Sequence, residues 1–244
     1  MKKIAENERS TLQPEKKTKI DRRIKKNLNA IYLSASQLFI EREFAEITME
    51  QIAERANISR STLYNHFRSK QEIYFQLGYD RIKSSNDRLA KLRSLPMTGF
   101  ETIMTLCSEA FKSIKKNPMY TKIIYLFLLN KNYLTVSKIV DKEIAPKEAQ
   151  KMLELPEIKI MVDFLIQLHI YENLWAEFVE KGISDGSITT NLAPTQLVQY
   201  LFLIINGTFD QMVLKQYVLQ KFELTDEVIF EMTLNIIKRL LHDN

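Results

Sequence analysis

The sequence predicts an all-α protein, in which an N-terminal three-helix domain is joined by a long helix to a larger C-terminal helical domain. Hydrophobic residues make up 45% of the 244 residues, and the chain has only five glycines and six prolines. This balance favours a compact helical fold over a strand-rich or disordered chain. Apolar residues also recur at helical spacing, and the length is sufficient for one large or two small domains with a core.

The N-terminal part is predicted to begin with a flexible basic extension over residues 1–18, where charges are scattered without periodicity. A helix is expected from about Lys19. Its apolar residues recur at helical spacing: Leu28, Ile31, Tyr32, Ala35, Leu38 and Phe39. Basic residues crowd its first turns: Arg22, Arg23, Lys25 and Lys26. They are compatible either with phosphate contacts or with a solvated helix end.

Residues 48–70 predict two short helices separated by a tight turn. Thr48 can cap the first helix, and Ile52, Ala53 and Ala56 form its buried stripe. Asn57 tolerates the left-handed backbone that such a turn often needs. Ser59 can cap the second helix, in which Leu63 and Phe67 face inward. The stretch is therefore predicted to be a helix-turn-helix.

The second of these helices is expected to present a polar face to its surroundings. That face comprises Arg60, Ser61, Thr62, Tyr64 and Asn65. A helix in the major groove of DNA needs donors for base edges and hydroxyls for phosphates, whereas a buried scaffold helix does not. The residue types therefore favour a surface that reads duplex DNA.

These residues resemble the DNA-binding signature of the TetR family of one-component bacterial transcription regulators. The similarity rests on Thr48, Ile52, Ala53, Ala56, Ile58, Ser59, Thr62, Leu63, Tyr64, His66, Phe67, Ser69 and Lys70. Asn57 and Ser61 stand where the family most often has glycine. Ser61 adds a side chain at the groove-facing surface, so the operator sequence of relatives is not carried over.

The resemblance implies a homodimeric repressor that binds a palindromic operator in double-stranded DNA and is released by a small-molecule effector. The residues expected to contact DNA are Thr48, Gln51, Ser59, Arg60, Ser61, Thr62, Tyr64, Asn65, His66 and Lys70. Arg60 is the expected base reader, because its planar fork matches guanine O6 and N7. Lys70 matches a position that grips phosphate or supports the recognition helix, and His66 could equally pack the helix end.

Charge is concentrated at the same end of the chain. Residues 1–70 contain 15 Lys or Arg against 9 Asp or Glu, whereas residues 71–244 contain 20 against 21. A basic segment beside a helix-turn-helix is typical of phosphate binding. For residues 1–18 alone, a solvated tail is the preferred interpretation.

The remainder is predicted as residues 71–244, a helical effector-binding and dimerisation domain that begins with a long connecting helix over Gln71–Arg93. Prolines mark breaks between helical patterns. The further helices expected are 99–116, 118–134, 157–181, 194–219 and 225–242. Residues 135–156 are ambiguous, with room for one short helix. Gly182 and Gly186 flank a predicted loop.

The last two helices are the predicted dimer element, because two apolar helices per subunit can pair into a four-helix bundle. The interface residues expected are Leu197, Leu201, Ile204, Gly207, Thr208, Val228, Met232 and Ile236. The alternative is that these helices seal the core of one subunit.

An effector cavity is expected between the middle helices, which are rich in aromatic residues. The residues expected to line it are Tyr125, Asn130, Gln167, His169, Tyr171 and Asn173, and Asn206 and Asp210 are further polar residues on apolar helices. Taken singly, each could instead make a structural hydrogen bond or be exposed.

Other kinds of function are not expected. His169 and Glu172 share a helix face, but the paired second half of a helical metal site is missing, so neither a metal, a cofactor nor catalytic residues are predicted. The longest apolar run, 123–129, is too short to span a membrane. Cys107 is the single cysteine, which suits a cytoplasmic protein. The rival interpretation is a protein-interaction or nucleoid-associated factor on the same scaffold.

Overall fold

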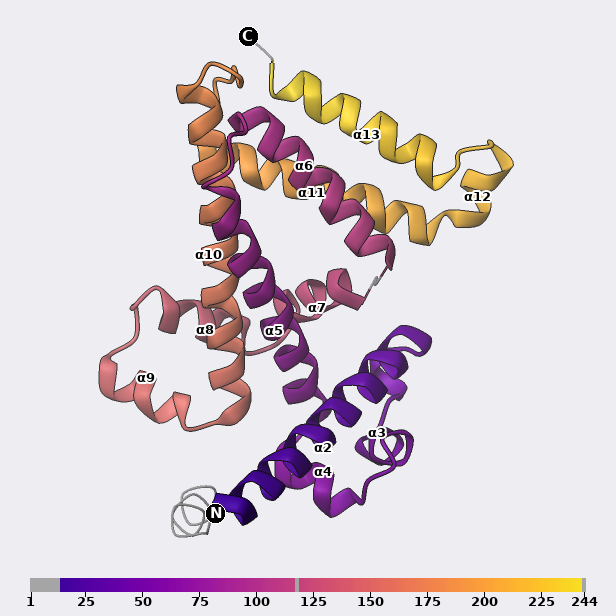
Figure 1. Cartoon of the computed structure of the whole chain (residues 1–244), viewed down its shortest axis with the longest axis vertical. Coiled ribbons are helices and arrows are strands. Elements are labelled where there is room, and N and C mark those ends of the chain that lie inside the picture. Colours follow the sequence, from indigo (N-terminus) through magenta and orange to yellow (C-terminus); the bar gives the residue numbers. More distant parts are fainter. Residues whose placement is uncertain (1–13, 117–118, 243–244) are drawn as a thin grey trace. The chain divides into compact units, whose positions relative to one another are not determined.

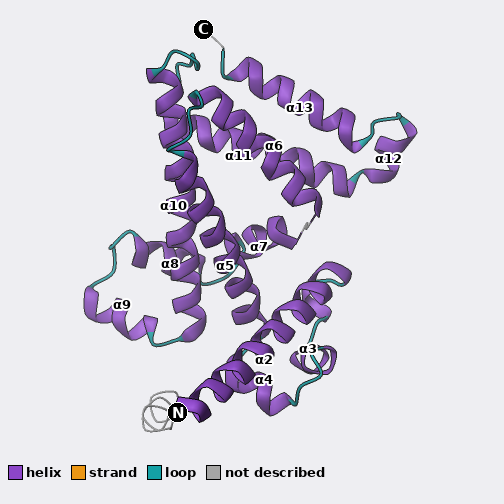
Figure 2. Cartoon of the chain, viewed as in Figure 1, coloured by secondary structure: helices purple, strands orange, loops and turns teal. Residues whose placement is uncertain are grey.

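The computed structural model describes residues 14–116 and 119–242, and it is built from helices (Figure 1). No strand occurs in those two ranges, so the all-α prediction is confirmed (Figure 2). The chain divides into two compact units, Met1–Leu77 and Gly78–Asn244. The boundary lies inside a long helix, α5, rather than after Lys70 as predicted.

The first unit contains the predicted three-helix arrangement. Its elements are α2 (Pro14–Glu41), the 3-10 turn η1 (Phe44–Glu46), α3 (Met49–Arg55), α4 (Arg60–His66) and the beginning of α5 (Lys70–Leu92). Its buried residues include Ile31 and Phe39 from α2, Ile52 from α3, Leu63 from α4 and Tyr74 from α5. These apolar stripes hold the helix-turn-helix against α2.

Two expectations for this unit are corrected. First, α2 begins at Pro14 rather than near Lys19, because proline suits the first turn of a helix and the following Glu and Lys residues are good helix formers. The rest of the expected extension, residues 1–13, lies outside the described residues. Second, the unit extends to Leu77, because Tyr74 packs edge-on against Phe39, with ring centroids 4.7 Å apart.

The second unit is a bundle in which α10 is the central helix. After the remainder of α5, its elements are α6 (Gly99–Lys116), α7 (Met119–Leu128), α8 (Tyr133–Val140), α9 (Pro146–Leu153), α10 (Pro156–Ser184), α11 (Pro194–Leu214), α12 (Gln216–Lys221) and α13 (Asp226–Leu240). α10 packs against α6, α8 and α11. Trp175 and Phe178 of α10 lie in a core with Ile103, Leu106 and Leu201.

Several expected helix boundaries are wrong. The helix expected over 118–134 ends at Leu128, where Asn130 Oδ1 accepts a hydrogen bond from the amide of Asn132 and closes a turn. Residues 133–153 form two helices, α8 and α9. The helix expected over 194–219 is interrupted at Lys215, which separates α11 from α12.

The loop after α10 anchors the start of α6. Gly182 is helical and buried rather than part of a loop, and a Cβ on Gly99 would lie only 2.1 Å from the Gly182 nitrogen. Asp185 Oδ2 accepts a hydrogen bond from the Gly99 amide at 2.9 Å, and Ser187 Oγ accepts one from the Phe100 amide at 3.0 Å. The first amides of α6, which lack partners within the helix, are thereby satisfied.

Candidate nucleic-acid interface and effector cavity

The helix-turn-helix has well-defined helix ends. Thr48 Oγ1 accepts a hydrogen bond from the Gln51 amide at 3.2 Å, and Gln51 Oε1 accepts one from the Thr48 amide at 2.9 Å. This capping box satisfies two amides at the start of α3. Asn57 adopts a left-handed conformation with φ 53°, and the Ile58 amide then donates to the Ala53 carbonyl at 3.0 Å. The tight turn expected at Asn57 is therefore present.

The start of α4 is held by hydroxyl groups. Ser59 Oγ accepts a hydrogen bond from the Thr62 amide at 3.1 Å and lies 2.9 Å from Ser61 Oγ and 2.8 Å from Thr62 Oγ1. Such a cluster satisfies the helix end and fixes where these hydroxyls point. Ser59 and Thr62 thus contribute to the shape of this surface in the protein without DNA.

The exposed face of α4 agrees with the arrangement expected from the sequence. Arg60, Ser61, Tyr64 and Asn65 are exposed, whereas Leu63 is buried. Thr62 and His66 are half-buried, and each has a partner within the protein. The side chain of Arg60 is 71% exposed, and its guanidinium lies 3.9 Å from Glu50 Oε1. An exposed ion pair of that length is weak, so Arg60 can reorient toward a base edge.

Lys70 makes several contacts within the first unit. Its ammonium donates hydrogen bonds to the carbonyl oxygens of Phe44 at 2.6 Å, Ala45 at 3.1 Å and Ile47 at 2.7 Å, and it lies 4.7 Å from the centre of the Phe44 ring. Burial lowers the pKa of Lys70 from its ordinary value. Lysine has three donors, and all three are used here. Of the two roles expected for Lys70, these bonds favour support over a phosphate contact, because they hold the segment in front of α3.

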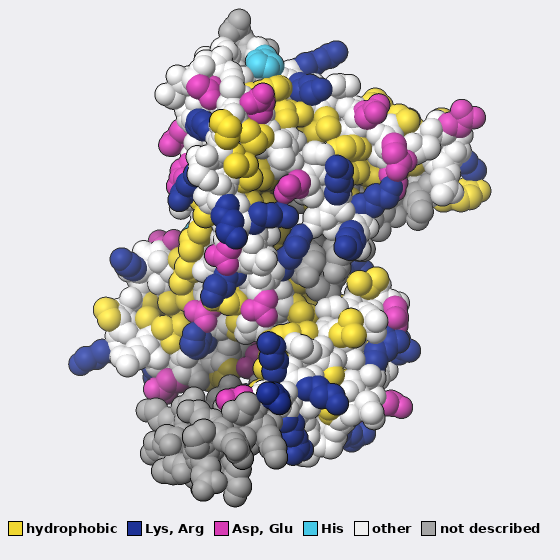
Figure 3. Space-filling model, in the orientation of Figure 1, with side chains coloured by type: hydrophobic (Ala, Val, Ile, Leu, Met, Phe, Trp, Pro, Cys, Tyr) yellow, Lys and Arg dark blue, Asp and Glu magenta, His cyan; other side chains and the backbone are white. Residues whose placement is uncertain are grey.

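Several basic side chains lie on the surface of the first unit. Figure 3 shows Lys and Arg side chains, in dark blue, over the visible face of this unit. Four basic side chains near the start of the described side chains of α2 are exposed: Arg22, Arg23, Lys25 and Lys26. Ile24, which lies between them in the sequence, is half-buried. Exposed cations beside the α4 face favour attraction of a polyanion.

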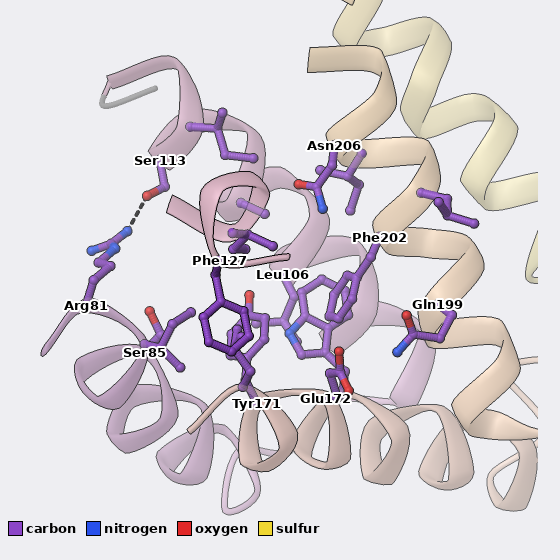
Figure 4. Close-up of a pocket in the computed structure, with 18 of the residues that line it drawn as sticks. Arg81, Ser85, Leu106, Ser113, Phe127, Tyr171, Glu172, Gln199, Phe202 and Asn206 are labelled. Carbon is purple, nitrogen blue, oxygen red and sulfur yellow. Dashed lines mark hydrogen bonds between the residues drawn. The ribbon is translucent and has the colours of Figure 1, made fainter. Parts of the chain in front are cut away.

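The second unit contains a partly open cavity of about 640 Å³ between α5, α6, α7, α8, α10 and α11. In Figure 4, the side chains of Phe127, Tyr171 and Phe202 gather at its centre. Gln199 and Asn206 reach it from α11. A volume of this size, with mainly apolar walls and a few polar groups, is typical of a small-molecule site.

The structure sorts the six residues expected to bind an effector. His169 and Tyr171 line the cavity. Asn173 is exposed and outside the lining, and Asn130 is used in the turn after α7. Gln167 Oε1 accepts a hydrogen bond from Asn86 Nδ2 at 3.0 Å, outside the lining. Asn173 is in solvent, Asn130 closes a turn and Gln167 pairs with Asn86 of α5, so the cavity lining does not support these three predictions. The side chain of Tyr125 lies outside the described residues.

Two charged residues and one polar residue of α5 were not predicted from the sequence. Arg81, Ser85 and Arg88 all line the cavity, and Arg81 donates a hydrogen bond to Ser113 Oγ. Arg88 Nη2 lies 3.4 Å from Glu109 Oε2. The spacing of the three α5 residues places them on one helix face beside Ile82 and Leu89, which was the available signal. Asn206 and Asp210, recognised as polar residues on an apolar helix, also line the cavity.

The residues expected in a dimer interface fall into two groups. Leu197 and Leu201 are fully buried and Ile204 packs against the same core, so these three belong to the interior of one subunit. Gly207 is exposed and Thr208 half-buried. Val228, Met232 and Ile236 on α13 are exposed, the last two by 56% and 55%. Tyr200 and Leu203 on α11, which were not predicted, are exposed as well.

The described ranges contain neither a membrane-spanning helix nor a metal-binding group of side chains. No helix there is long and apolar enough to cross a membrane. In the same ranges no three His, Cys, Asp or Glu side chains converge in a group able to hold a metal ion.

The capped helix-turn-helix with an exposed polar second helix has the architecture of helix-turn-helix DNA-binding domains. A helical unit with a partly open cavity follows it. Residues 31–77 match the family described as "Bacterial regulatory proteins, tetR family". The N-terminal helix-turn-helix of this chain is therefore similar to that of the TetR family.

Two curated relatives come from Mycolicibacterium smegmatis. The "HTH-type transcriptional activator FasR" is 41% identical over 44 residues, which cover 18% of this chain and 20% of FasR. The "HTH-type transcriptional repressor KstR2" is 21% identical over 159 residues, which cover 65% of each protein. The matched segments thus span a fifth of one relative and less than two thirds of the other. Both relatives are transcriptional regulators rather than enzymes.

A solved structure extends the similarity over most of the chain. FadR from Bacillus subtilis, in complex with stearoyl-CoA, superposes with a TM-score of 0.59 at 16% identity, covering 87% of this chain and 96% of FadR. This likeness concerns the fold. The helical second unit therefore belongs to the same architecture as that of FadR.

Proposed function

We propose that the protein is a homodimeric repressor that reads a palindromic operator through α4 and is released by a small molecule bound in the cavity of the second unit. The observation that carries the proposal is the exposed face formed by Arg60, Ser61, Tyr64 and Asn65 on a helix whose other side is buried. Arg60 is the base reader, and the hydroxyls at the start of α4 contact phosphates.

The exposed apolar residues of α11 and α13 support the dimer. Met232 and Ile236 on α13 and Leu203 on α11 are large and mostly exposed. Exposed apolar side chains of this kind are typical of an interface between subunits. Two reading heads related by a twofold axis would contact half-sites roughly 34 to 36 Å apart, one turn of DNA.

The continuity of α5 supports coupling between ligand and DNA. At its start, Lys70 donates a hydrogen bond to the Phe44 carbonyl and Tyr74 packs against the Phe44 ring, both within the first unit. Further along the same helix, Arg81 and Arg88 line the cavity. A ligand that favours one position of α5 would shift the population of the DNA-binding state. It does so only if its affinities for the two states differ.

The relatives support a regulator and a ligand without deciding the direction of control. FasR is named an activator and KstR2 a repressor, and FadR is described in complex with stearoyl-CoA. Repression is proposed here because release by ligand needs only a loss of DNA affinity. Acting on DNA would place the protein in the bacterial cytoplasm. The rival role in protein interaction is not favoured, because the polar face of α4 is intact and exposed.

The test is binding of the full chain to genomic fragments, including the DNA upstream of its own reading frame, followed by footprinting. We expect protection of a palindrome and a strong preference for it over random duplex. Binding to all duplexes with equal affinity, or none at low salt, would overturn the proposal. A reporter gene placed behind the protected site then separates repression from activation.

A further inference from the structure

Trp175 places an unsatisfied hydrogen-bond donor in the wall of the cavity. It is the only tryptophan of the chain, it lines the cavity from α10, and it is 1% exposed. Its ring packs against Phe202, with centroids 5.1 Å apart, and against Tyr171, with centroids 6.0 Å apart. The buried Nε1–H has no acceptor at hydrogen-bonding distance and angle, although it lies close enough to the Tyr171 hydroxyl to lower the pKa of that group. A buried donor without an acceptor is unfavourable, so a ligand oxygen that supplies one gains affinity.

Two guanidiniums, of Arg81 and Arg88, and three carboxylates, of Glu109, Glu172 and Asp210, line the cavity with this donor. Burial raises the pKa of the neighbouring Tyr171 hydroxyl, whereas contact with Trp175 and the charges of Arg88 and Arg81 act in the opposite direction. Both guanidiniums line the cavity. Of the carboxylates, Glu109 lies 3.4 Å from the Arg88 guanidinium, Glu172 is half-buried and Asp210 is exposed.

We propose that the effector carries a carbonyl-type oxygen, as a carboxylate or a neutral carbonyl, which accepts a hydrogen bond from Trp175 Nε1 while its apolar body packs against Tyr171 and Phe202. This inference rests on the proposed function, because it concerns the same cavity (Figure 4). An alkylammonium head does not fit this position, because it has no lone pair to accept the hydrogen of Trp175 Nε1.

The experiment uses three probes that share a ten-carbon chain and differ in the head: decanoate, methyl decanoate and decylammonium. Each is titrated into the full-length protein below its micelle concentration, and binding is measured by calorimetry and by the emission of Trp175. We expect decanoate or methyl decanoate to bind, to change the emission, and to exceed the affinity of decylammonium by at least roughly tenfold. The relative affinity of decanoate and methyl decanoate shows whether the oxygen is charged.

Decylammonium that binds as tightly as both carbonyl probes would overturn the inference. So would the absence of binding by both carbonyl probes up to millimolar concentration. These comparisons use the unaltered protein, so they do not depend on the folding of a variant.

A pair of variants separates the Nε1–H from the aromatic wall. Trp175→Phe removes the donor and keeps a ring, and calorimetry is expected to show a loss of roughly tenfold for the carbonyl probes, with less change for decylammonium. Phe202→Leu is the matched control, because it alters the apolar wall and should weaken all three probes alike. Circular dichroism verifies that each variant is folded. An unchanged preference for the carbonyl probes in folded Trp175→Phe would refute the contact.

Operator binding without ligand is measured separately. Protein that binds its operator but ignores the carbonyl probes leaves the proposed regulator intact and removes this inference. Protein that binds the carbonyl probes but no duplex DNA supports this inference and overturns the proposed regulator.

Discussion

The ammonium nitrogen of Lys70 lies 2.6 Å from the carbonyl oxygen of Phe44, and it joins the first residue of α5 to the 3-10 turn η1. The same nitrogen lies 2.7 Å from the carbonyl oxygen of Ile47, the residue before the cap of α3. A hydrogen bond from a charged group is worth more than one between neutral groups, roughly 1.5 to 3 kcal/mol. Lys70 therefore sets the position of the helix-turn-helix relative to the start of α5.

Lys70→Met tests this role, because it keeps most of the apolar stem and removes the ammonium. We expect a lower melting temperature and weaker operator binding, with an unchanged slope of log affinity against log salt concentration. A phosphate contact would instead lower that slope by about 0.9. Lys91→Met, at an exposed position in the last turn of α5, is the control and should leave both measurements unchanged. A slope reduced by about one would restore the phosphate contact.

Arg60→Ala should reduce discrimination among operator variants by about 1 to 3 kcal/mol, because one bidentate base contact is lost. Affinity for random duplex should fall much less, and competition binding with operator and random DNA measures both quantities. Arg55→Ala is the matched control, since Arg55 forms a 2.7 Å ion pair with Glu41 in the scaffold. Equal losses on operator and random DNA for Arg60→Ala would argue against a base contact.

Met232→Glu should convert the dimer to a monomer, because it places a charge in the proposed apolar interface of α13. Analytical ultracentrifugation measures the mass, and operator affinity should fall with it. Leu134→Glu is the control, because Leu134 on α8 is 71% exposed and lies outside α11 and α13. A Met232→Glu protein that remains dimeric, or an unaltered protein that is monomeric, would show that the interface is elsewhere.

Asp185→Asn should remove a pH-dependent contribution to stability. The side chain of Ser187, and then the Gly99 amide, hold the pKa of Asp185 below its ordinary value of 3.8. Because the folded pKa is the lower one, this contribution is present above the unfolded pKa and is lost as pH falls through the folded pKa. Urea midpoints of the native and Asn proteins should differ at about pH 7 and converge in acid.

Asp87→Asn, an exposed change on α5, is the control for Asp185→Asn and should follow the native protein at every pH. If the gap between the native and Asp185→Asn proteins stays constant into strong acid, the loss comes from the altered shape of the loop and not from its charge.

Short-range patterns made the first unit predictable. The cap at Thr48, the left-handed Asn57 and the second cap at Ser59 each depend on neighbours within three or four residues. The same holds for the inward side chain of Leu63 and the exposed Arg60, which follow from helical periodicity. A single sequence contains this information, because backbone capping and helix faces are local properties.

Contacts between distant residues were not predictable in the same way. Leu197 and Met232 both lie on apolar helix stripes, yet one is fully buried and the other 56% exposed. Gln167 was predicted to bind a ligand, but in the folded chain its side chain accepts a hydrogen bond from Asn86 of α5. Periodicity shows that a stripe exists but does not show which neighbour covers it.

The amino-acid sequence by itself determined the all-helical class, the helix-turn-helix and the residues on the outer face of α4, since hydrophobic spacing and capping act over a few residues. Only the tertiary structure decided that Lys70 binds three carbonyls, that Arg81 and Arg88 face a cavity, and that α11 buries Leu197. Those outcomes depend on which helices pack together. Packing is a balance of burial and hydrogen bonding summed over the whole unit.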